Sequence, residues 1–349
     1  WEELHRYLPK GWEEAAREQK ALERSRSVKT ADDLLALNLM YMTEGGSYQA
    51  TSSMMAMTTD IHLNKNAVRK RIQKSWQWLR WMAERLCRTQ GYAMEKPEWL
   101  TGRRVVLVDG TDMVLQGSKG SDYRLHYAFD LFGYHCEQME LTTAKEGEKL
   151  TRYKVKAEDI IIADRGYGTI RGMEHVRAGG GNYILRLKAG AFALYDAQGK
   201  RIDLLSILRP LKPVENESIA CFYQTSDGSK EAVRIVAMRK DEASAAAASR
   251  ALDRQVSRHQ YAPVRKETRQ ASQYIVLATN LTEDTARVLE LYRARWQIEQ
   301  VFHRLKGLFA FGEVPGSNPD SVKAWFYGKL FLAALCETMV KHAAFPPEG

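Results

Sequence analysis

Paired cysteines are missing from the sequence. The four cysteines, Cys87, Cys136, Cys221 and Cys336, are scattered over 349 residues, and none belongs to a Cys-x-x-Cys pair. This pattern disfavours a disulfide scaffold and a structural zinc site, and it fits a reducing compartment.

Long apolar runs, internal repeats and low-complexity tracts are also missing. The longest apolar stretch, residues 324–340, is interrupted by Lys329 and Glu337, so it is too short and too charged to span a membrane. No signal peptide is visible. Because the chain opens on Trp1 rather than Met, we expect that its native start has been trimmed.

The excess of basic over acidic residues is moderate. The chain has 52 Lys and Arg against 43 Asp and Glu, for a formal net charge of +9. This balance permits a nucleic-acid partner without demonstrating one. With 349 residues, of which 44% are hydrophobic and 27% charged, the chain can bury a sizeable core and is expected to form two or three units.

Residues 1–100 show helical periodicity, and one segment of them is strongly basic. Residues 64–88 hold eight basic residues and one acid, with three tryptophans among them. Together with residues 48–59 and a polar turn near residues 60–64, this segment is similar to a helix-turn-helix. We expect DNA contacts from its first basic residues: Lys65, Arg69, Lys70, Arg71 and Lys74. The alternative is an ordinary amphipathic helix with Trp and Leu facing inward and the basic side chains in water.

Beyond residue 103 the pattern predicts a mixed α/β sheet. Apolar strands are expected at residues 105–108, 160–163 and 183–187, further strands at 123–132 and 136–143, and a helix at 169–178. Residues 189–281 are interpreted as a mostly β insertion, in which residues 242–251 form a helix or a flexible excursion. We therefore expect four parts: residues 1–100, 101–188, 189–281 and 282–349.

Two aspartates follow the most apolar strands. Asp109 ends the run Val-Leu-Val-Asp, and Asp164 ends the run Ile-Ile-Ala-Asp. A carboxylate at the carboxyl tip of a buried strand faces the crevice where α/β folds bind ligands. Two of them suit a hard cation such as Mg²⁺. The alternative is that each aspartate only ends its strand, since Asp and Gly are common turn residues.

The helical segment at residues 291–306 carries an unusual polar face. At about 100° per residue, five side chains share one arc: Tyr292, Arg295, Glu299, His303 and Lys306. Apolar residues occupy the opposite side. A lone acid among basic and aromatic groups suits a carboxylate at a metal beside an anionic backbone. The alternative is an exposed, salt-bridged face.

The spacing in this segment resembles a known signature. Tyr292-x2-Arg295-x3-Glu299-x6-Lys306 is similar to the YREK signature of the insertion-sequence-4 family of transposases, which are relatives of the Tn-five and Tn-ten enzymes. The contexts of the two aspartates and the long insertion after the second one also resemble that family. The resemblance covers most of residues 103–340, while the N-terminal hundred residues match only in general character.

The resemblance implies a ribonuclease H-like mixed-sheet catalytic core with a mostly β insertion, preceded by an α-helical N-terminal DNA-binding domain. It also implies a DDE triad of Asp109, Asp164 and Glu299 that binds two Mg²⁺ ions, with Mn²⁺ as a substitute. One ion would activate water or a DNA 3′-hydroxyl, and the other would stabilise the leaving oxygen.

Further residues acquire roles from the same resemblance. Tyr292, Arg295 and Lys306 would hold phosphates near the scissile bond. Trp296 is expected either to stack on an unpaired base or to serve in a core or an interface. For His303 a phosphate contact stands against simple packing or contact with water.

The implied activity is cut-and-paste transposition of an insertion sequence, by DNA cleavage and by strand transfer into target DNA, with a hairpin step in some family members. The expected partners are the inverted-repeat ends, target DNA and a second copy of the chain, with residues 321–342 as a candidate pairing surface. The expected location is the bacterial cytoplasm, at the nucleoid. The alternatives are a catalytically inactive, repurposed DNA-binding protein and a structure-specific nuclease without strand transfer.

Overall fold

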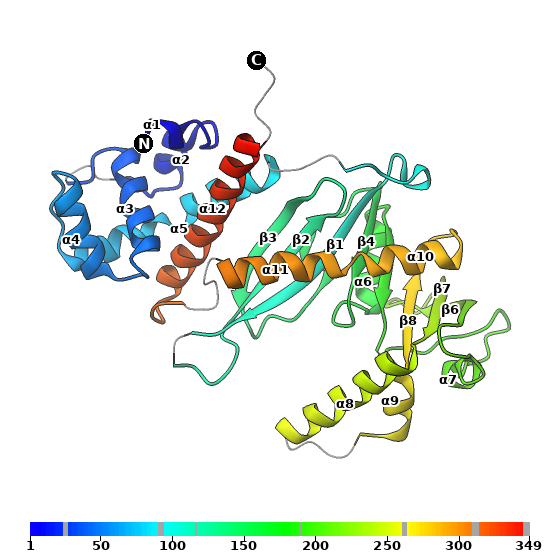
Figure 1. Cartoon of the computed structure of the whole chain (residues 1–349). Coiled ribbons are helices and arrows are strands. Elements are labelled where there is room, and N and C mark those ends of the chain that lie inside the picture. The colour runs from blue at the N-terminus through cyan, green and yellow to red at the C-terminus, as the bar shows by residue number, and fades with distance from the viewer. Residues whose placement is uncertain are drawn as a thin grey trace. The chain divides into compact units, whose positions relative to one another are not determined.

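The computed structural model describes residues 1–23, 27–89, 94–115, 117–188, 190–259, 264–308 and 314–344 (Figure 1). The chain divides into two compact units. Unit 1 comprises Trp1–Glu95, Gly110–Glu146 and Glu299–Gly349, and unit 2 comprises Lys96–Asp109 and Gly147–Ile298. The units therefore interleave along the chain.

Within the described residues, eight strands form one mixed sheet in the order β3-β2-β1-β4-β5-β8-β7-β6. The strands are β1 (Arg104–Met113), β2 (Tyr123–Asp130), β3 (His135–Thr143), β4 (Asp159–Ala163), β5 (Asn182–Arg186), β6 (Asn216–Gln224), β7 (Lys230–Arg239) and β8 (Tyr274–Thr279). β1, β4 and β5 are parallel, whereas β8 pairs antiparallel with β5 and β7, and β7 pairs antiparallel with β6. The predicted mixed α/β sheet is confirmed, and it is consistent with a ribonuclease H-like core.

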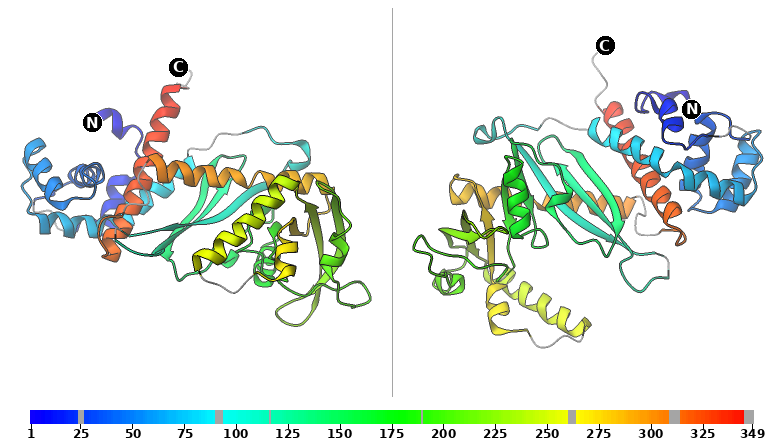
Figure 2. Two further views of the ribbon diagram at one scale, coloured as in Figure 1. Left: turned by 60° about the horizontal axis from the view of Figure 1, so that its bottom comes forward. Right: turned by 180° about the vertical axis from the view of Figure 1, so that it is seen from behind.

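Unit 2 packs helices on both faces of its part of the sheet. Its helices are α6 (Ile170–Ala178), α7 (Leu204–Leu208), α8 (Glu242–His259), α9 (Lys266–Ala271) and α10 (Thr285–Arg293), with short 3-10 turns at Glu98–Leu100 and Leu150–Arg152. In Figures 1 and 2, α6 and α10 lie on opposite faces. All five residues of β4 are buried, as expected of a strand covered on both sides.

The interpretation of residues 189–281 as mostly β is wrong. The segment holds α7, α8 and α9 beside β6, β7 and β8. The Ala-rich stretch that the sequence left open as helix or excursion is part of α8, because alanine has the highest helix propensity. In addition, β8 pairs directly with β5, so the segment extends the core sheet.

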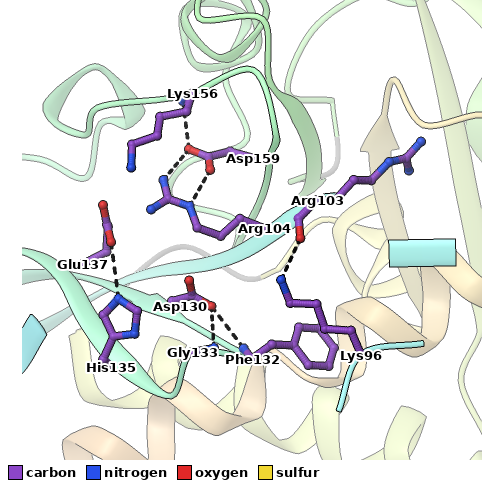
Figure 3. Close-up of polar contacts among 10 residues, drawn as sticks. All are labelled: Lys96, Arg103, Arg104, Asp130, Phe132, Gly133, His135, Glu137, Lys156 and Asp159. Atoms are coloured by element: carbon purple, nitrogen blue, oxygen red, sulfur yellow. Dashed lines mark hydrogen bonds and ion pairs between the residues drawn. The ribbon is translucent and has the colours of Figure 1, made fainter. Parts of the chain in front are cut away.

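A buried ion pair fixes the register of β1 against β4. Arg104 Nε and Nη2 donate to the two carboxylate oxygens of Asp159 at 2.7 and 3.0 Å, and the Lys156 amide donates to the same carboxylate at 2.9 Å (Figure 3). The Asp159 side chain is completely buried. Because Arg104 pairs with Asp159 at the amino ends of both strands, this contact sets which residues stand side by side at the carboxyl ends.

Unit 1 combines the first helices of the chain with the last one. Its complete helices are α1 (Glu2–His5), α2 (Trp12–Glu18), α3 (Ala31–Thr43), α4 (Tyr48–Thr58), α5 (Lys65–Thr89) and α12 (Pro319–Ala344). α12 packs along α5 and also contacts α3. Its buried face comprises Trp325, Phe326, Tyr327, Leu330 and Phe331. That face is used inside the unit, so it is not available as the candidate pairing surface.

The predicted N-terminal helices are present. Thr30 and Asp33 cap α3 reciprocally, which explains its sharp start. Trp78 is fully buried on α5, and its indole N–H donates to the Trp12 carbonyl at 2.8 Å. This tryptophan therefore faces inward, as the amphipathic alternative expected.

All four cysteines lie in the described part of the chain, and each is a free thiol. Within the described ranges, the helices lack the combination of length and apolar character that crossing a bilayer requires.

Candidate active site

Asp109 and Asp164 occupy neighbouring positions on parallel strands of unit 2. Val108 and Ala163 are the last pair in the register between β1 and β4. Asp109 directly follows Val108, and Asp164 directly follows Ala163. The prediction that Asp109 ends its strand is wrong, because β1 continues to Met113. Its pairing with β4 ends at Val108, however, so both carboxylates still stand where the parallel pairing stops.

The same lateral row contains a third charged residue, Arg186. Ala163 pairs with Leu185 of β5, so Arg186 stands next to Asp164. Arg186 Nη1 contacts Asp164 Oδ1 at 3.5 Å. The sequence analysis missed this residue. A charged residue at the carboxyl end of a third apolar strand was the signal that could have identified it.

Arg295 connects the two aspartates. Its Nη1 donates to Asp109 Oδ2 at 3.3 Å, and only 13% of the Arg295 side chain is exposed. Its charge also acts on Asp164. Burial alone would raise the pKa of Asp164, but the charges of Arg186 and Arg295 lower it below its usual value.

Tyr292 lies against the second aspartate. Its hydroxyl donates to Asp164 Oδ1 at 3.3 Å, and its ring lies 6.0 Å from the Arg295 guanidinium carbon. Burial, followed by the nearby Asp164 charge, raises the pKa of Tyr292 to about 12. The hydroxyl is therefore a donor at neutral pH. The structure thus brings together four of the residues that the sequence singled out: Asp109, Asp164, Tyr292 and Arg295.

Residues 291–306 do not form one continuous helix. The prediction of a shared arc of side chains depended on such a helix and is therefore wrong. α10 ends at Arg293, and α11 (Trp296–Leu308) begins after a turn at Ala294 and Arg295. Amides in this turn bond to carbonyls three residues back, as Ile298 does to Arg295 at 3.1 Å. Such a 3-10 turn advances the chain by a larger angle per residue than an α-helix does. The single arc is therefore interrupted, and Tyr292 is buried rather than displayed on a polar face.

The remaining residues of the signature lie on α11. Glu299 is in the first turn of this helix and is the first residue there that belongs to unit 1. Glu299, His303 and Lys306 are all exposed. The apolar side of α11 is buried as expected, with Ile298, Val301 and Leu305 in the core. The meeting of Glu299 with the two aspartates stays a prediction.

Trp296 is 56% exposed at the start of α11. This exposure contradicts the core role that the sequence left open for it. Base stacking and an interface role both remain as predictions.

The five basic residues of α5 that were predicted to contact DNA differ in their surroundings. Four of them are exposed: Lys65, Arg69, Lys70 and Lys74. Arg71 is half-buried, and burial lowers its pKa. Lys74 forms an ion pair with Glu23 at 2.5 Å, so part of its charge is already compensated. DNA contact by this helix stays a prediction, carried mainly by Lys65, Arg69 and Lys70, which are exposed.

The chemistry of the two aspartates fits a divalent cation. Carboxylate oxygens are the hard donors that Mg²⁺ and Mn²⁺ prefer. The arginine contacts at 3.3 and 3.5 Å are longer than a usual charge-assisted hydrogen bond of about 2.7–2.9 Å, so a metal ion can displace them. In the described part of the chain, no three His, Cys, Asp or Glu side chains gather as a metal site. A third carboxylate ligand beside the two aspartates stays a prediction.

Similarity to known proteins identifies the family. Residues 100–336 match the family model described as a transposase DDE domain. The chain is 29% identical to the putative transposase InsL for insertion sequence element IS186A of Escherichia coli (strain K12), over 98% of this chain and 94% of that protein. It is 30% identical to the transposase for insertion sequence element IS421 of Escherichia coli, with the same coverage of 98% and 94%. The transposase for insertion sequence element IS231F of Bacillus thuringiensis subsp. israelensis is 23% identical over 97% of this chain and 80% of that protein. The chain belongs to the family of transposases with a DDE domain.

Proposed function

We propose that this transposase catalyses cut-and-paste movement of a bacterial insertion sequence of the insertion-sequence-4 family, by cleaving DNA strands and joining them to target DNA. The observation that carries the proposal is that two residues of the Tyr-Arg-Glu-Lys spacing contact the two aspartates. Arg295 bonds to Asp109, and Tyr292 bonds to Asp164. A chance match of spacing on a solvated face has no reason to produce these contacts.

In this proposal Asp109, Asp164 and Glu299 hold two Mg²⁺ ions, for which Mn²⁺ can substitute. When bound, these ions supply activation of a water or 3′-hydroxyl nucleophile and stabilisation of the leaving oxygen in an in-line displacement. The two aspartates suit this role because their neighbouring strands hold them rigidly and because Asp164 is ionised at neutral pH, given its lowered pKa.

The chain's other groups position the DNA. The Tyr292 hydroxyl orients Asp164 by donating to it, so its role is at the carboxylate rather than at a phosphate. Arg295 places its guanidinium charge beside the reacting bond, where it attracts phosphate oxygens. Lys306 and His303, both exposed on α11, contact the backbone, and the exposed Trp296 stacks on an unpaired base if a hairpin forms.

The helices before the catalytic core bind DNA away from the chemistry. Lys65, Arg69 and Lys70 are exposed at the start of α5, directly after the turn that follows α4. In this proposal they contact backbone phosphates of the inverted repeat, with Arg71 and Lys74 in lesser roles. Two ends must be held at once, so the active complex is a homodimer on DNA, at the bacterial nucleoid.

The test uses a duplex that ends in the inverted repeat flanking the coding region. With Mg²⁺ or Mn²⁺, the purified protein is expected to cleave this duplex at the element boundary and to join it to a target plasmid. Asp109→Asn, Asp164→Asn and Glu299→Gln each reduce both products to the level without protein. Glu290→Gln, at an exposed acid on α10, serves as the matched control with full activity.

The outcomes separate the alternatives. Cleavage without joining identifies a structure-specific nuclease. Binding of the repeat with no cleavage, and with Glu299→Gln indistinguishable from the wild type, identifies a repurposed DNA-binding protein.

A further inference from the structure

The helix α8 of unit 2 stands apart from the hydrophobic core. It spans Glu242–His259, and none of its side chains that the structure describes is buried. The shorter α9, Lys266–Ala271, has no buried residue either. In Figures 1 and 2, α8 extends away from the sheet, and in the described part of the chain it packs extensively against no other helix or strand. Packing in the core therefore does not explain why this helix is so long.

α8 has two distinct sides. Its half-buried side chains fall on one side at about 100° per residue: Ala245, Ala248, Ser249, Leu252 and Val256. The opposite side is exposed, and its charged residues are Arg250 and Arg254. These arginines are four residues apart, which is about 6 Å along the helix axis. Both guanidinium groups are therefore presented to solvent on the same side of the helix.

Another residue compensates the acid that lies between these arginines in the sequence, Asp253. Arg269 of α9 donates to Asp253 Oδ1 at 2.6 Å and to Oδ2 at 3.3 Å, and it also donates to Ser249 Oγ at 2.6 Å. In the described part of the chain, the Arg250 and Arg254 side chains form no hydrogen bond or ion pair. Their positive charges are therefore available to a ligand.

The contacts of Arg269 also show which side of α9 lies next to α8. Lys266 precedes Arg269 by three residues, so it lies within about 60° of it around the helix. Lys266 is exposed. Glu267 lies about 160° from Arg269, on the other side of α9. The side of α9 next to α8 therefore adds a further positive charge to the two arginines.

We propose that Arg250, Arg254 and Lys266 bind the phosphate backbone of a DNA duplex, and we call α8 and α9 together the basic arm. The inference rests on the proposed function for the identity of the polyanion. Cations on an exposed surface bind the DNA backbone by releasing its counterions, and such contacts carry no sequence information. The basic arm lies outside the Tyr-Arg-Glu-Lys spacing and outside the first helices of the chain, so it adds a DNA contact that neither of them provides.

The experiment measures the salt dependence of DNA binding by the full chain without divalent metal, so that no cleavage occurs. A fluorescein-labelled duplex that ends in the flanking inverted repeat is titrated with protein at several KCl concentrations. Each phosphate contact contributes about 0.9 to the slope of log K against log salt concentration. Arg250→Gln/Arg254→Gln is expected to lower the slope by about twice this amount, whereas Arg250→Lys/Arg254→Lys retains it.

The matched control removes two positive charges from the same unit outside the basic arm. Arg201→Gln/Lys212→Gln changes two exposed residues, and its slope is expected to equal that of the wild type. A duplex of unrelated sequence should show the same changes, because phosphate contacts do not depend on the bases. Glutamine forms helices about as well as arginine, so the variants are expected to keep the fold, and thermal unfolding verifies this.

The results distinguish the two proposals. If Arg250→Gln/Arg254→Gln keeps the wild-type slope, or if the control loses as much, the basic arm does not bind DNA. Cleavage of the ends by the wild type would then leave the proposed function intact. If the slope falls only in the arm variant but the wild type never cleaves, the basic arm stands and the proposed function fails.

Discussion

The ion pair between Arg104 and Asp159 provides a demanding test of how the sheet is stabilised. The Asp159 carboxylate is 0% exposed and receives two bonds from Arg104, whose own side chain is 14% exposed. Arg104→Met keeps the length of the side chain but removes both guanidinium donors, so that the Lys156 amide is the remaining donor shown to this carboxylate. Breaking one partner of a buried pair costs about 3–5 kcal/mol, because a buried charge is left uncompensated.

Urea unfolding followed by tryptophan fluorescence measures this loss. For a slope of roughly 3 kcal/mol per molar urea, the midpoint of Arg104→Met is expected about 1–2 M below that of the wild type. The double variant Arg104→Met/Asp159→Leu is expected to recover most of the loss, because well-packed apolar residues can replace a buried pair. Arg293→Met, at an exposed arginine on α10, controls for the substitution itself.

Two results would refute this reasoning. A loss below about 1 kcal/mol for Arg104→Met would mean that the pair behaves like an exposed salt bridge. If the double variant is no more stable than Arg104→Met, the loss of stability comes from lost packing of the arginine rather than from the uncompensated charge of Asp159.

Two further predictions concern the site and the core. Tyr292→Phe removes one long hydrogen bond to Asp164, worth about 0.5–1.5 kcal/mol, so single-turnover cleavage should slow about tenfold or less with unchanged DNA affinity; a complete loss of cleavage would show that the hydroxyl has a larger role. Gly168→Ala places a Cβ in steric conflict with the Arg186 carbonyl oxygen; it should lower the free energy of unfolding by about 1–3 kcal/mol, and a neutral result in urea would contradict the tight approach.

The sequence predicted most of the sheet because its buried strands are short, uninterrupted apolar runs. The run before Asp164 corresponds to β4, and residues 105–108 lie within β1. The continuation of β1 to Met113 was not predictable, because Asp, Gly and Thr in this stretch carry turn signals. What keeps them in a strand is the tertiary environment, which local propensity does not contain.

The candidate site was predictable to the extent that its residues share a local pattern. Strand ends identified Asp109 and Asp164, and fixed spacing identified Tyr292 and Arg295. The turn at Ala294 rotates Tyr292 out of line with the residues of α11. The spacing of residues in the sequence does not reveal this turn, so the burial of Tyr292 could not be predicted. Arg186 was missed for another reason, because its place beside Asp164 depends on the pairing of β4 with β5.

The packing of α12 against α5 has a consequence for synthesis of the protein. The buried face of α5 finds its partner in residues near the end of the chain, since α12 spans Pro319–Ala344. A ribosome that adds about 5–20 residues per second exposes α5 many seconds before α12 has been made. Throughout that time the basic helix lacks its apolar cover. Unit 1 is therefore completed only after α12 has been synthesised, and a truncated product without α12 would carry the basic residues but not the folded unit.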